Sequence, residues 1–238
     1  TATGHVSLRD NTTGDNNVAN GANSLADNTT GNNNTANGYS SLFKNLTGSN
    51  NVANGTYSLF NNVGSNNVAS GYQSFQNNTT GGGNTGLGRA TGLTNTTGTN
   101  NTFLGSNADA NASNLTNATA IGANAQVGAS NAIVLGAING VNGATAHTNV
   151  GIGTTSPSAR LHTHIVSPST PALIVTSGNS FSNTSTVVQF DANSSLTNAF
   201  NLQRDGKIGI GTSTPNALLD VSGYTETDSL RVLAGAGT

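Results

Sequence analysis

The sharpest local signal for chemistry is a pair of histidines, His162 and His164, separated by one threonine. In a strand, residues two apart share a face. If that face looks onto a threefold axis, six imidazoles from three chains can surround one divalent metal ion. The alternative is two polar histidines on a solvated face, or one packed against a neighbour. The sequence therefore leaves open an axial metal and predicts no other cofactor.

The carboxylates do not form an evident catalytic pair. None of them recurs at a repeat position that would bring two together within one chain; they are Asp10, Asp15, Asp27, Asp109, Asp191, Asp205, Asp220, Glu226 and Asp228. Glycosidases need two such groups about 5–10 Å apart. We therefore expect no catalytic residue and no enzyme, and keep a carboxylate pair formed across chains as the alternative. The segments Gly81-Gly82-Gly83 and Gly151-Ile152-Gly153 complete no nucleotide-binding fingerprint and indicate turns.

Asparagine carries a second candidate chemistry, because several asparagines begin N-x-S/T glycosylation sequons. They include Asn28, Asn45 and Asn95. The structural alternative is that asparagines at one repeat position stack into ladders and cap turns. The repeat itself fixes Asn-Thr-Thr, so the sequon match follows automatically, and we favour the structural interpretation.

These residues sit in a repeat that sets the fold. The phrase G-x-N-N-V-A-N-G-x-x-S-L-x-x-N-T-T recurs at a constant spacing, as from Gly14 to Gly31 to Gly48, and only the step from Gly48 to Gly64 is shorter, by a single position. A short fixed period indicates one small unit stacked many times. Each unit turns at a glycine, often in an Asn-Gly pair that accepts positive φ. The predicted turn glycines are Gly21, Gly38, Gly55, Gly71, Gly88, Gly105, Gly122 and Gly136.

Each unit holds two short apolar pieces that we predict as strands. The first is represented by 17–20, and the second by Ser24-Leu25 and its counterparts. Pieces of about five residues suit strands and are too short for helices. Coils stacked at about 4.8 Å would pair their backbones with the coils on either side. The fold class predicted is all-β, a repetitive parallel β-roll or solenoid.

Side-chain size suggests what fills such a coil. Alternation along the first piece points the small residues inward and their neighbours outward; the inward residues are Ala19, Ala36, Ala53 and Ala69. We expect an interior too thin for a normal core, so that burial of Leu42, Phe43, Leu59 and Phe60 needs a partner surface. Exposed apolar surface costs about 25 cal/mol per Å², and cyclic self-association removes it.

Composition excludes several classes of function. Of 238 residues, 33% are hydrophobic and 7% are charged, with a net charge of −2. No basic surplus exists to neutralise phosphates, so we expect no nucleic-acid partner. No apolar run approaches the ~20 residues that span a bilayer, so we expect no membrane insertion in this segment. Cysteine is absent, which excludes disulfides.

Two segments near the end of the repeat region, 118–122 and 131–136, end in Gly122 and Gly136. With the Val18 to Gly21 segment and its counterparts, they resemble the head repeat of trimeric autotransporter adhesins (YadA-like heads), whose unit has the spacing from Gly122 to Gly136. That resemblance covers roughly 4–136 and implies a left-handed parallel β-roll with three chains side by side. The number three comes from the resemblance. Most coils here are longer than the family's unit, as the step from Gly21 to Gly38 shows.

The second half carries a different phrase, G-I-G-T-x-x-P-x-A-x-L, beginning at Gly151 and again at Gly209. It is similar to a pattern of phage tail-fibre shafts and large bacterial surface fibres. We predict a linker or neck at 137–148, an interleaved shaft module at 149–223 and the start of a further shaft segment at 224–238. Between the copies we expect strands at 172–176 and 185–190.

Two turns of the second half can also be predicted. The alternating segment 200–204 and the segment 207–210 flank Asp205-Gly206 and predict a hairpin. Proline favours a first helical turn, so a short helix is the expectation after Pro157 or Pro215.

The function expected from these features is structural and adhesive. We predict a segment of a trimeric extracellular fibre, on a cell surface or a virion tail, that meets a host-surface glycan or a protein receptor. Tyr39, Tyr57 and Tyr72 lie near the corner glycines, where they either stack on sugars or cover the coil edge. The alternatives are a carbohydrate-cleaving tailspike and an ice-binding solenoid. Ice binding needs a regular T-x-T face, whereas the threonines here gather at corners such as Thr29-Thr30 and Thr96-Thr97.

Overall fold

The computed structural model describes residues 1–164, 186–190, 200–203 and 205–221. Contacts divide the chain into two compact units, 1–164 and 165–238. The division falls inside the predicted module 149–223. The predicted strand 172–176 and the segment 224–238 lie outside the described residues.

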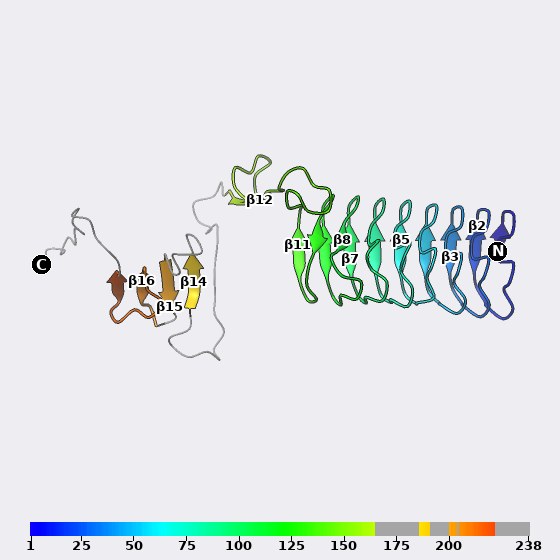
Figure 1. Ribbon diagram of the computed structural model, residues 1–238, viewed down its shortest axis with the longest axis horizontal. Helices are drawn as coiled ribbons and strands as arrows, with labels where there is room; N and C mark the ends of the chain where they lie inside the picture. The colour runs from blue at the N-terminus through cyan, green and yellow to red at the C-terminus, as the bar shows by residue number, and fades with distance from the viewer. Residues whose placement is uncertain (165–185, 191–199, 204, 222–238) are drawn as a thin grey trace, which may run out of the picture. The chain divides into compact units, whose positions relative to one another are not determined.

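The first unit is a β-solenoid (Figure 1). One short strand from each coil joins a nine-stranded sheet in the order β1-β2-β3-β4-β5-β6-β7-β9-β11, and every neighbouring pair is parallel. The fold class predicted from the repeat is confirmed. The strands are β1 (Ala2–Thr3), β2 (Val18–Asn20), β3 (Thr35–Asn37), β4 (Val52–Asn54), β5 (Val68–Ser70), β6 (Thr85–Leu87), β7 (Thr102–Leu104), β9 (Thr119–Ile121) and β11 (Ile133–Leu135).

The strand register reproduces the sequence period. Ala19 pairs with Ala36 and Ala36 with Ala53, and Ala53 pairs with Ala69 one residue earlier than the period requires. All four alanines are fully buried, as the alternation predicts. The repeat therefore fixes which side of the strand faces the interior.

The second apolar piece of most coils is not a strand, contrary to the prediction. Residues around Leu25, Leu42 and Leu59 form turns, and these leucines have φ near 50°. Their backbones still bridge coils, as when the Leu42 N–H donates to the Ser58 carbonyl over 3.0 Å. Among the described residues, only the last coils form a second sheet, in which β8 (Asp109–Ala110) pairs with β10 (Gln126–Val127).

The interior holds a genuine core, so the expectation of a coil too thin for one is wrong. Leu42 and Leu59 are fully buried within the single chain. The turns set these leucines facing the alanines of the sheet, and together they form one apolar cluster. Phe43 and Phe60 instead lie partly exposed on the outside. Leu42 and Leu59 therefore need no partner surface.

The corner glycines bring successive coils into close contact. Gly38 has φ +133°, and a Cβ built on it would lie 2.7 Å from the carbonyl carbon of Gly55. The predicted turn glycines all have positive φ, from 81° at Gly136 to 140° at Gly71. Coils this close leave no room for a side chain at the corner.

The predicted neck, 137–148, is built of turns that lie against the solenoid. Ala137 and Ala144 are buried, and the Asn142 amide donates to the Asn107 carbonyl. Next come β12 (Val150–Ile152) and β13 (Leu161–Thr163), a parallel pair with Gly151 opposite His162.

The second unit contains a sheet of β14 (Thr186–Phe190), β15 (Phe200–Gln203), β16 (Ile208–Ile210) and β17 (Leu219–Val221). The hairpin predicted around Asp205-Gly206 is confirmed, because β15 and β16 are antiparallel. So is a strand within 185–190. No helix follows Pro157 or Pro215; bends lead from each proline into β13 or β17.

The two G-I-G-T copies share one local structure. In each, the strand that begins the motif pairs in parallel with the strand that follows the motif's loop, as Val150 with Leu161 and Ile208 with Leu219. In each, the threonine hydroxyl accepts the N–H of the residue two further on, at 3.2 Å. The repeated phrase therefore encodes a strand–loop–strand unit and not a helix.

Candidate functional site

The interior asparagines form two ladders parallel to the solenoid axis. In the first, the side-chain amide of each asparagine donates to the side-chain oxygen of the equivalent residue one coil earlier, at 2.6–3.3 Å, through Asn11, Asn28, Asn45, Asn62, Asn78 and Asn95. In the second, each side-chain oxygen accepts the backbone N–H of the next member, at 2.9–3.0 Å, through Asn17, Asn34, Asn51, Asn67, Asn84 and Asn101. Buried amides are stable only when their donors and acceptors are paired, and the ladders provide that pairing.

The ladders bear directly on the sequons. Asn28, Asn45 and Asn95 are fully buried, and each also donates to the carbonyl of the glycine three residues later. A glycan cannot be attached to a side chain enclosed in this way. The geometry agrees with the structural interpretation for these three sequons.

In several corner Thr-Thr pairs the first threonine is engaged within the fold. The Thr29 hydroxyl donates to the Leu46 carbonyl over 2.7 Å, and the Thr79 hydroxyl donates to the Thr96 carbonyl over 2.9 Å. The hydroxyls of Thr29 and Thr79 are therefore bound to the next coil, whereas the threonines that follow them, Thr30 and Thr80, are exposed.

The two histidines lie at β13 and directly after it. Their rings are 6.5 Å apart and perpendicular. The His162 Nδ1 accepts the backbone N–H of Ser158 at 3.2 Å, and in the second motif copy Asp220 accepts the N–H of Asn216 at 2.9 Å. His162 thus stands where the other copy has a carboxylate acceptor.

That hydrogen bond constrains metal binding by His162. A neutral imidazole has one lone pair and one N–H, so an Nδ1 that accepts from Ser158 leaves the proton on Nε2. Binding a metal at Nε2 would require that proton to move to Nδ1, which would end the hydrogen bond from the Ser158 N–H and leave only the Ser158 hydroxyl oxygen, 3.4 Å away, as an acceptor. Within the described part of one chain, no three His, Cys, Asp or Glu residues come together to hold a metal ion, and the threefold site stays a prediction.

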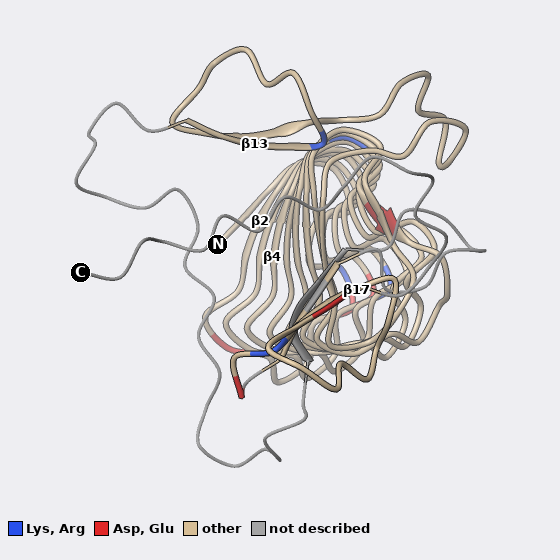
Figure 2. Ribbon diagram, turned by 90° about the vertical axis from the view of Figure 1, so that its left-hand side faces the viewer, with Lys and Arg blue, Asp and Glu red and all other residues tan. Residues whose placement is uncertain are grey.

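The acidic side chains of the solenoid are dispersed, and Figure 2 shows few charged positions along the coils. Arg9 contacts both Asp10 and Asp27 at 2.9 Å, and its hydrogen bond lowers the pKa of Asp10. Asp109 differs, because it is buried. Its carboxylate accepts the Thr94 hydroxyl at 2.9 Å and the Ala110 N–H at 2.8 Å, yet burial raises its pKa.

Five aromatic rings gather on the outside of three successive coils, and we call them the outer aromatic patch: Tyr39, Phe43, Tyr57, Phe60 and Tyr72. Tyr57 is central, 5.5 Å from Tyr39, 6.5 Å from Tyr72 and 5.7 Å from Phe60 between ring centroids. Phe43 stacks on Phe60 at 5.2 Å. Tyr39 and Tyr72 are each 47% exposed.

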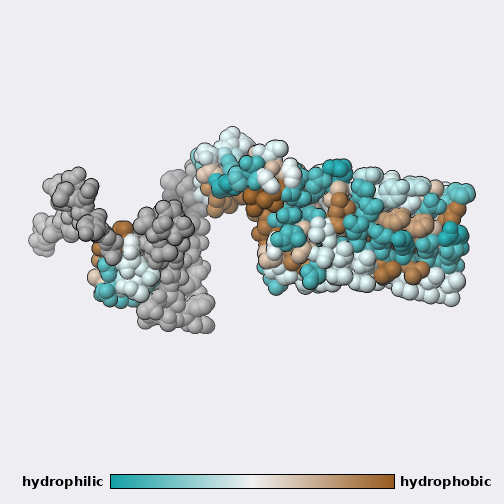
Figure 3. Space-filling model, viewed as in Figure 1, coloured by the Kyte–Doolittle hydropathy of each residue, from teal (hydrophilic) through white to brown (hydrophobic). Residues whose placement is uncertain are grey.

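A second outward surface lies on the later strands of the nine-stranded sheet. One register column contains Leu87, Leu104, Ile121 and Leu135, which we call the outer apolar stripe. Leu87, Ile121 and Leu135 are 45%, 39% and 52% exposed. Figure 3 shows brown, apolar surface gathered at the end of the solenoid where β11 lies.

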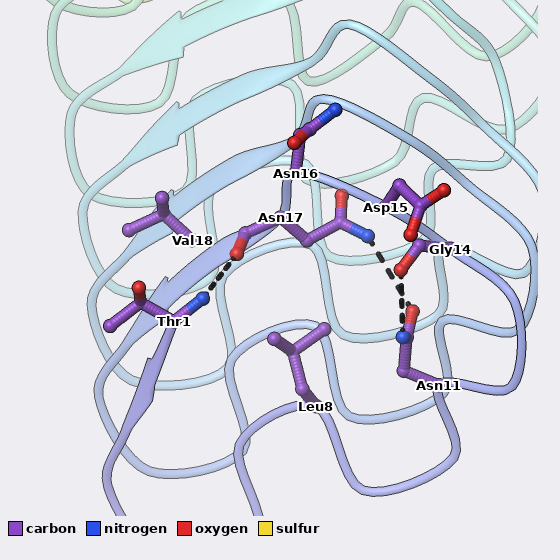
Figure 4. A pocket seen from close by; sticks show the side chains of 8 residues that line it. All are labelled: Thr1, Leu8, Asn11, Gly14, Asp15, Asn16, Asn17 and Val18. Carbon is purple, nitrogen blue, oxygen red and sulfur yellow. Dashed lines mark hydrogen bonds between the residues drawn. The ribbon is translucent and has the colours of Figure 1, made fainter.

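The first coil surrounds a hollow of about 500 Å³ lined by residues that include Leu8, Asn11 and Asn17. Figure 4 shows Asn11 and Asn17 directed toward each other there, with Thr1 donating to the Asn17 carbonyl over 2.7 Å. Its asparagines, Asn11 and Asn17, belong to the two asparagine ladders, so the hollow is part of the coil interior and not a separate binding site.

Searches of protein-family models, curated proteins and solved structures found no match to this chain. None of the described residues forms a helix with the length and apolar character that crossing a membrane requires.

Two features were missed by reasoning from sequence. The buried carboxylate of Asp109 carries no motif, and only its place between the small residues Ala108 and Ala110 hints at burial. The outer apolar stripe was visible as a change from Asn20, Asn37 and Asn54 to leucine and isoleucine at one repeat position.

Proposed function

We propose that this chain is a structural and adhesive segment of an extracellular fibre made of three copies, on a cell surface or a virion tail. The observation that carries the proposal is the outer apolar stripe, which runs in register along the solenoid from Leu87 to Leu135. A column parallel to the stacking direction suits copies that lie side by side. The number three rests on the resemblance to trimeric adhesin heads.

The stripe supports association of a limited strength. Fully burying a leucine or isoleucine contributes about 1.5–3 kcal/mol, so a half-exposed one contributes about 1 kcal/mol. Four such residues give about 4 kcal/mol per chain, similar to the lower estimates, of about 4 kcal/mol, for the cost of association. Further contacts between the copies must therefore add to the stripe.

Sedimentation analysis of the whole chain tests the proposal. A trimer has a mass of about 71 kDa, three times 23.6 kDa, and the apolar stripe should be required for it. Ile121→Lys places a charge in the stripe and should shift the mass toward 23.6 kDa. Leu46→Lys is the matched control, because Leu46 is 48% exposed and lies outside the stripe. A wild-type monomer, or equal effects of the two variants, would contradict the proposal.

A further inference from the structure

We propose that the outer aromatic patch, together with Lys44, binds an acidic carbohydrate, a chain of pyranose sugars that carries carboxylates. This inference rests on the proposed function, since it names the ligand class of an adhesive fibre and the residues that hold it.

The patch is a continuous aromatic surface and not a set of isolated rings. From Tyr39 the contacts run through Tyr57 to Tyr72, and from Tyr57 through Phe60 to Phe43, with every step between 5.2 and 6.5 Å. Neighbouring tyrosines meet edge to face, at 89° and 73°. Because neighbouring rings are perpendicular, the surface is uneven and presents ring faces in more than one direction.

Such a surface matches the chemistry of a pyranose. One face of a pyranose ring carries mainly C–H groups, which pack on an aromatic face, while its hydroxyls remain available to polar groups at the rim. Tyrosine serves both needs, because its ring is apolar and its hydroxyl donates and accepts hydrogen bonds. Tyr39 and Tyr72 are each 47% exposed, so both contribute accessible ring surface.

Lys44 supplies the charge that selects an acidic sugar. Its ammonium lies 5.5 Å from the centroid of Phe60, at the edge of the patch. The acidic residue at the same position one coil earlier, Asp27, is held by Arg9 at 2.9 Å. In the described part of the chain, no carboxylate lies within ion-pair distance of Lys44. Lys44 is therefore available to a carboxylate of the ligand.

The limited length of the patch favours a ligand over a second copy of the chain. An interface between parallel rods should continue from coil to coil. At the repeat position of Tyr39 and Tyr72, the other coils carry small or polar residues, namely His5, Ala22, Thr56, Arg89, Ser106 and Ala123. The patch is thus confined to the turns of a short stretch of the solenoid, whereas the outer apolar stripe lies on the strands of later coils.

Tyrosine fluorescence provides a direct assay, because the chain has no tryptophan and four tyrosines, three of them in the patch. Tyr224→Phe removes the fourth and makes the patch the only emitter. The probe is a hyaluronan hexasaccharide, in which N-acetylglucosamine alternates with glucuronate, and the neutral comparison is chitohexaose. We expect the acidic probe to change the emission with a Kd on the order of 0.1–1 mM, the weak range of a small exposed site.

Three variants in this background define the site. Tyr72→Ala should weaken binding at least about tenfold and Tyr72→Phe should largely retain it, because stacking uses the ring. Lys44→Gln should lower the affinity for the acidic probe several-fold without changing the affinity for the neutral one. Ile138→Ala is the control, because Ile138 is 46% exposed and lies outside both the outer aromatic patch and the outer apolar stripe. Far-UV circular dichroism of each variant verifies folding.

The outcomes separate the two proposals. Absence of binding by the acidic probe up to about 10 mM, equal affinity for the two probes, or no effect of Tyr72→Ala overturns the carbohydrate site. The mass of the same samples is measured in parallel. A trimer that does not bind leaves the proposed fibre intact, whereas a monomer that binds overturns the trimeric fibre and retains the site.

Discussion

The packing around Phe75 makes a quantitative prediction about how neighbouring coils share interior volume. In the earlier coils the interior pair is alanine on the strand and leucine on the turn, such as Ala53 and Leu59. Phe75 occupies the leucine position of its coil, and the next coil has glycine at both positions, Gly86 and Gly92. A Cβ built on Gly86 would lie 2.6 Å from Phe75 Cε2, and one on Gly92 would lie 2.4 Å from Phe75 Cε1.

Gly86→Ala should therefore destabilise the chain although alanine is the usual residue at this repeat position. The φ of Gly86 is not in the left-handed region, so the backbone accepts alanine. The Phe75 ring opposes the new methyl group most closely, and the Thr91 hydroxyl, 2.8 Å from the built Cβ, opposes it as well. An ordinary contact is 3.4–4 Å, and the ring would have to move by most of an ångström within a packed core. Overpacking of this kind costs about 1–3 kcal/mol.

The second variant, Phe75→Leu, restores the residue that the other coils use. Alone it removes buried atoms and should cost about 1 kcal/mol, well below the ~3–5 kcal/mol of a truncation to alanine. Combined with Gly86→Ala it recreates the alanine–leucine pair. The double variant should then be more stable than the sum of the single changes by about 1–3 kcal/mol.

Urea denaturation followed by circular dichroism, at one fixed protein concentration, measures all four members of this cycle. Gly128→Ala is the control, because Gly128 is exposed, has no left-handed φ and would meet only the end of the Asn111 side chain at 3.1 Å. It should change the free energy of unfolding by a few tenths of a kcal/mol at most. Additive single changes, or a neutral Gly86→Ala, would refute the shared-volume argument.

Two further substitutions test buried polar groups. Asn45→Ala removes the hydrogen bonds to the Asn28 side chain and the Gly48 carbonyl. Urea denaturation should therefore show a free energy of unfolding lower by about 2–4 kcal/mol. A decrease no larger than that of Asn54→Ala, on the outer surface, would contradict the stabilising role of the ladder. The pKa of Asp109 is raised in the folded chain. Protonated Asp109 therefore makes its full contribution to the free energy of unfolding below the unfolded pKa, and that contribution is lost as pH rises through the folded pKa. Asp109→Asn should therefore gain stability relative to the wild type between acid and neutral pH, and a pH-independent difference in urea midpoint would count against burial as the dominant cause.

The sequence predicted the strand side of each coil because that side obeys simple rules. A constant period, small residues at alternate positions and glycine at the corner leave one parallel register that buries Ala19, Ala36 and Ala53 together. The opposite side follows no such rule. Leu42 reaches the interior from a turn with φ near 50°, a conformation that leucine rarely adopts and that a strand pattern cannot reveal.

The candidate sites also differ in how far the sequence predicts them. The buried asparagines were predictable as ladders, because the repeat places identical amides one coil apart. The environment of His162 was not, because its contact with the Ser158 N–H depends on the loop of the G-I-G-T motif. Comparison with the second copy, where Asp220 accepts the equivalent N–H, indicates an acceptor role in the loop that the His-x-His spacing does not suggest.

The filled interior changes where self-association must be sought. If Leu42 and Leu59 were exposed, every coil would offer apolar surface and copies could pair along the whole solenoid. They are buried, so the driving force must come from outward positions. One such column carries Asn20, Asn37, Asn54 and Ser70 in the first coils and then the outer apolar stripe. Association should therefore be strongest along β6, β7, β9 and β11, while the first coils keep a polar sheet face and an aromatic patch open to a ligand.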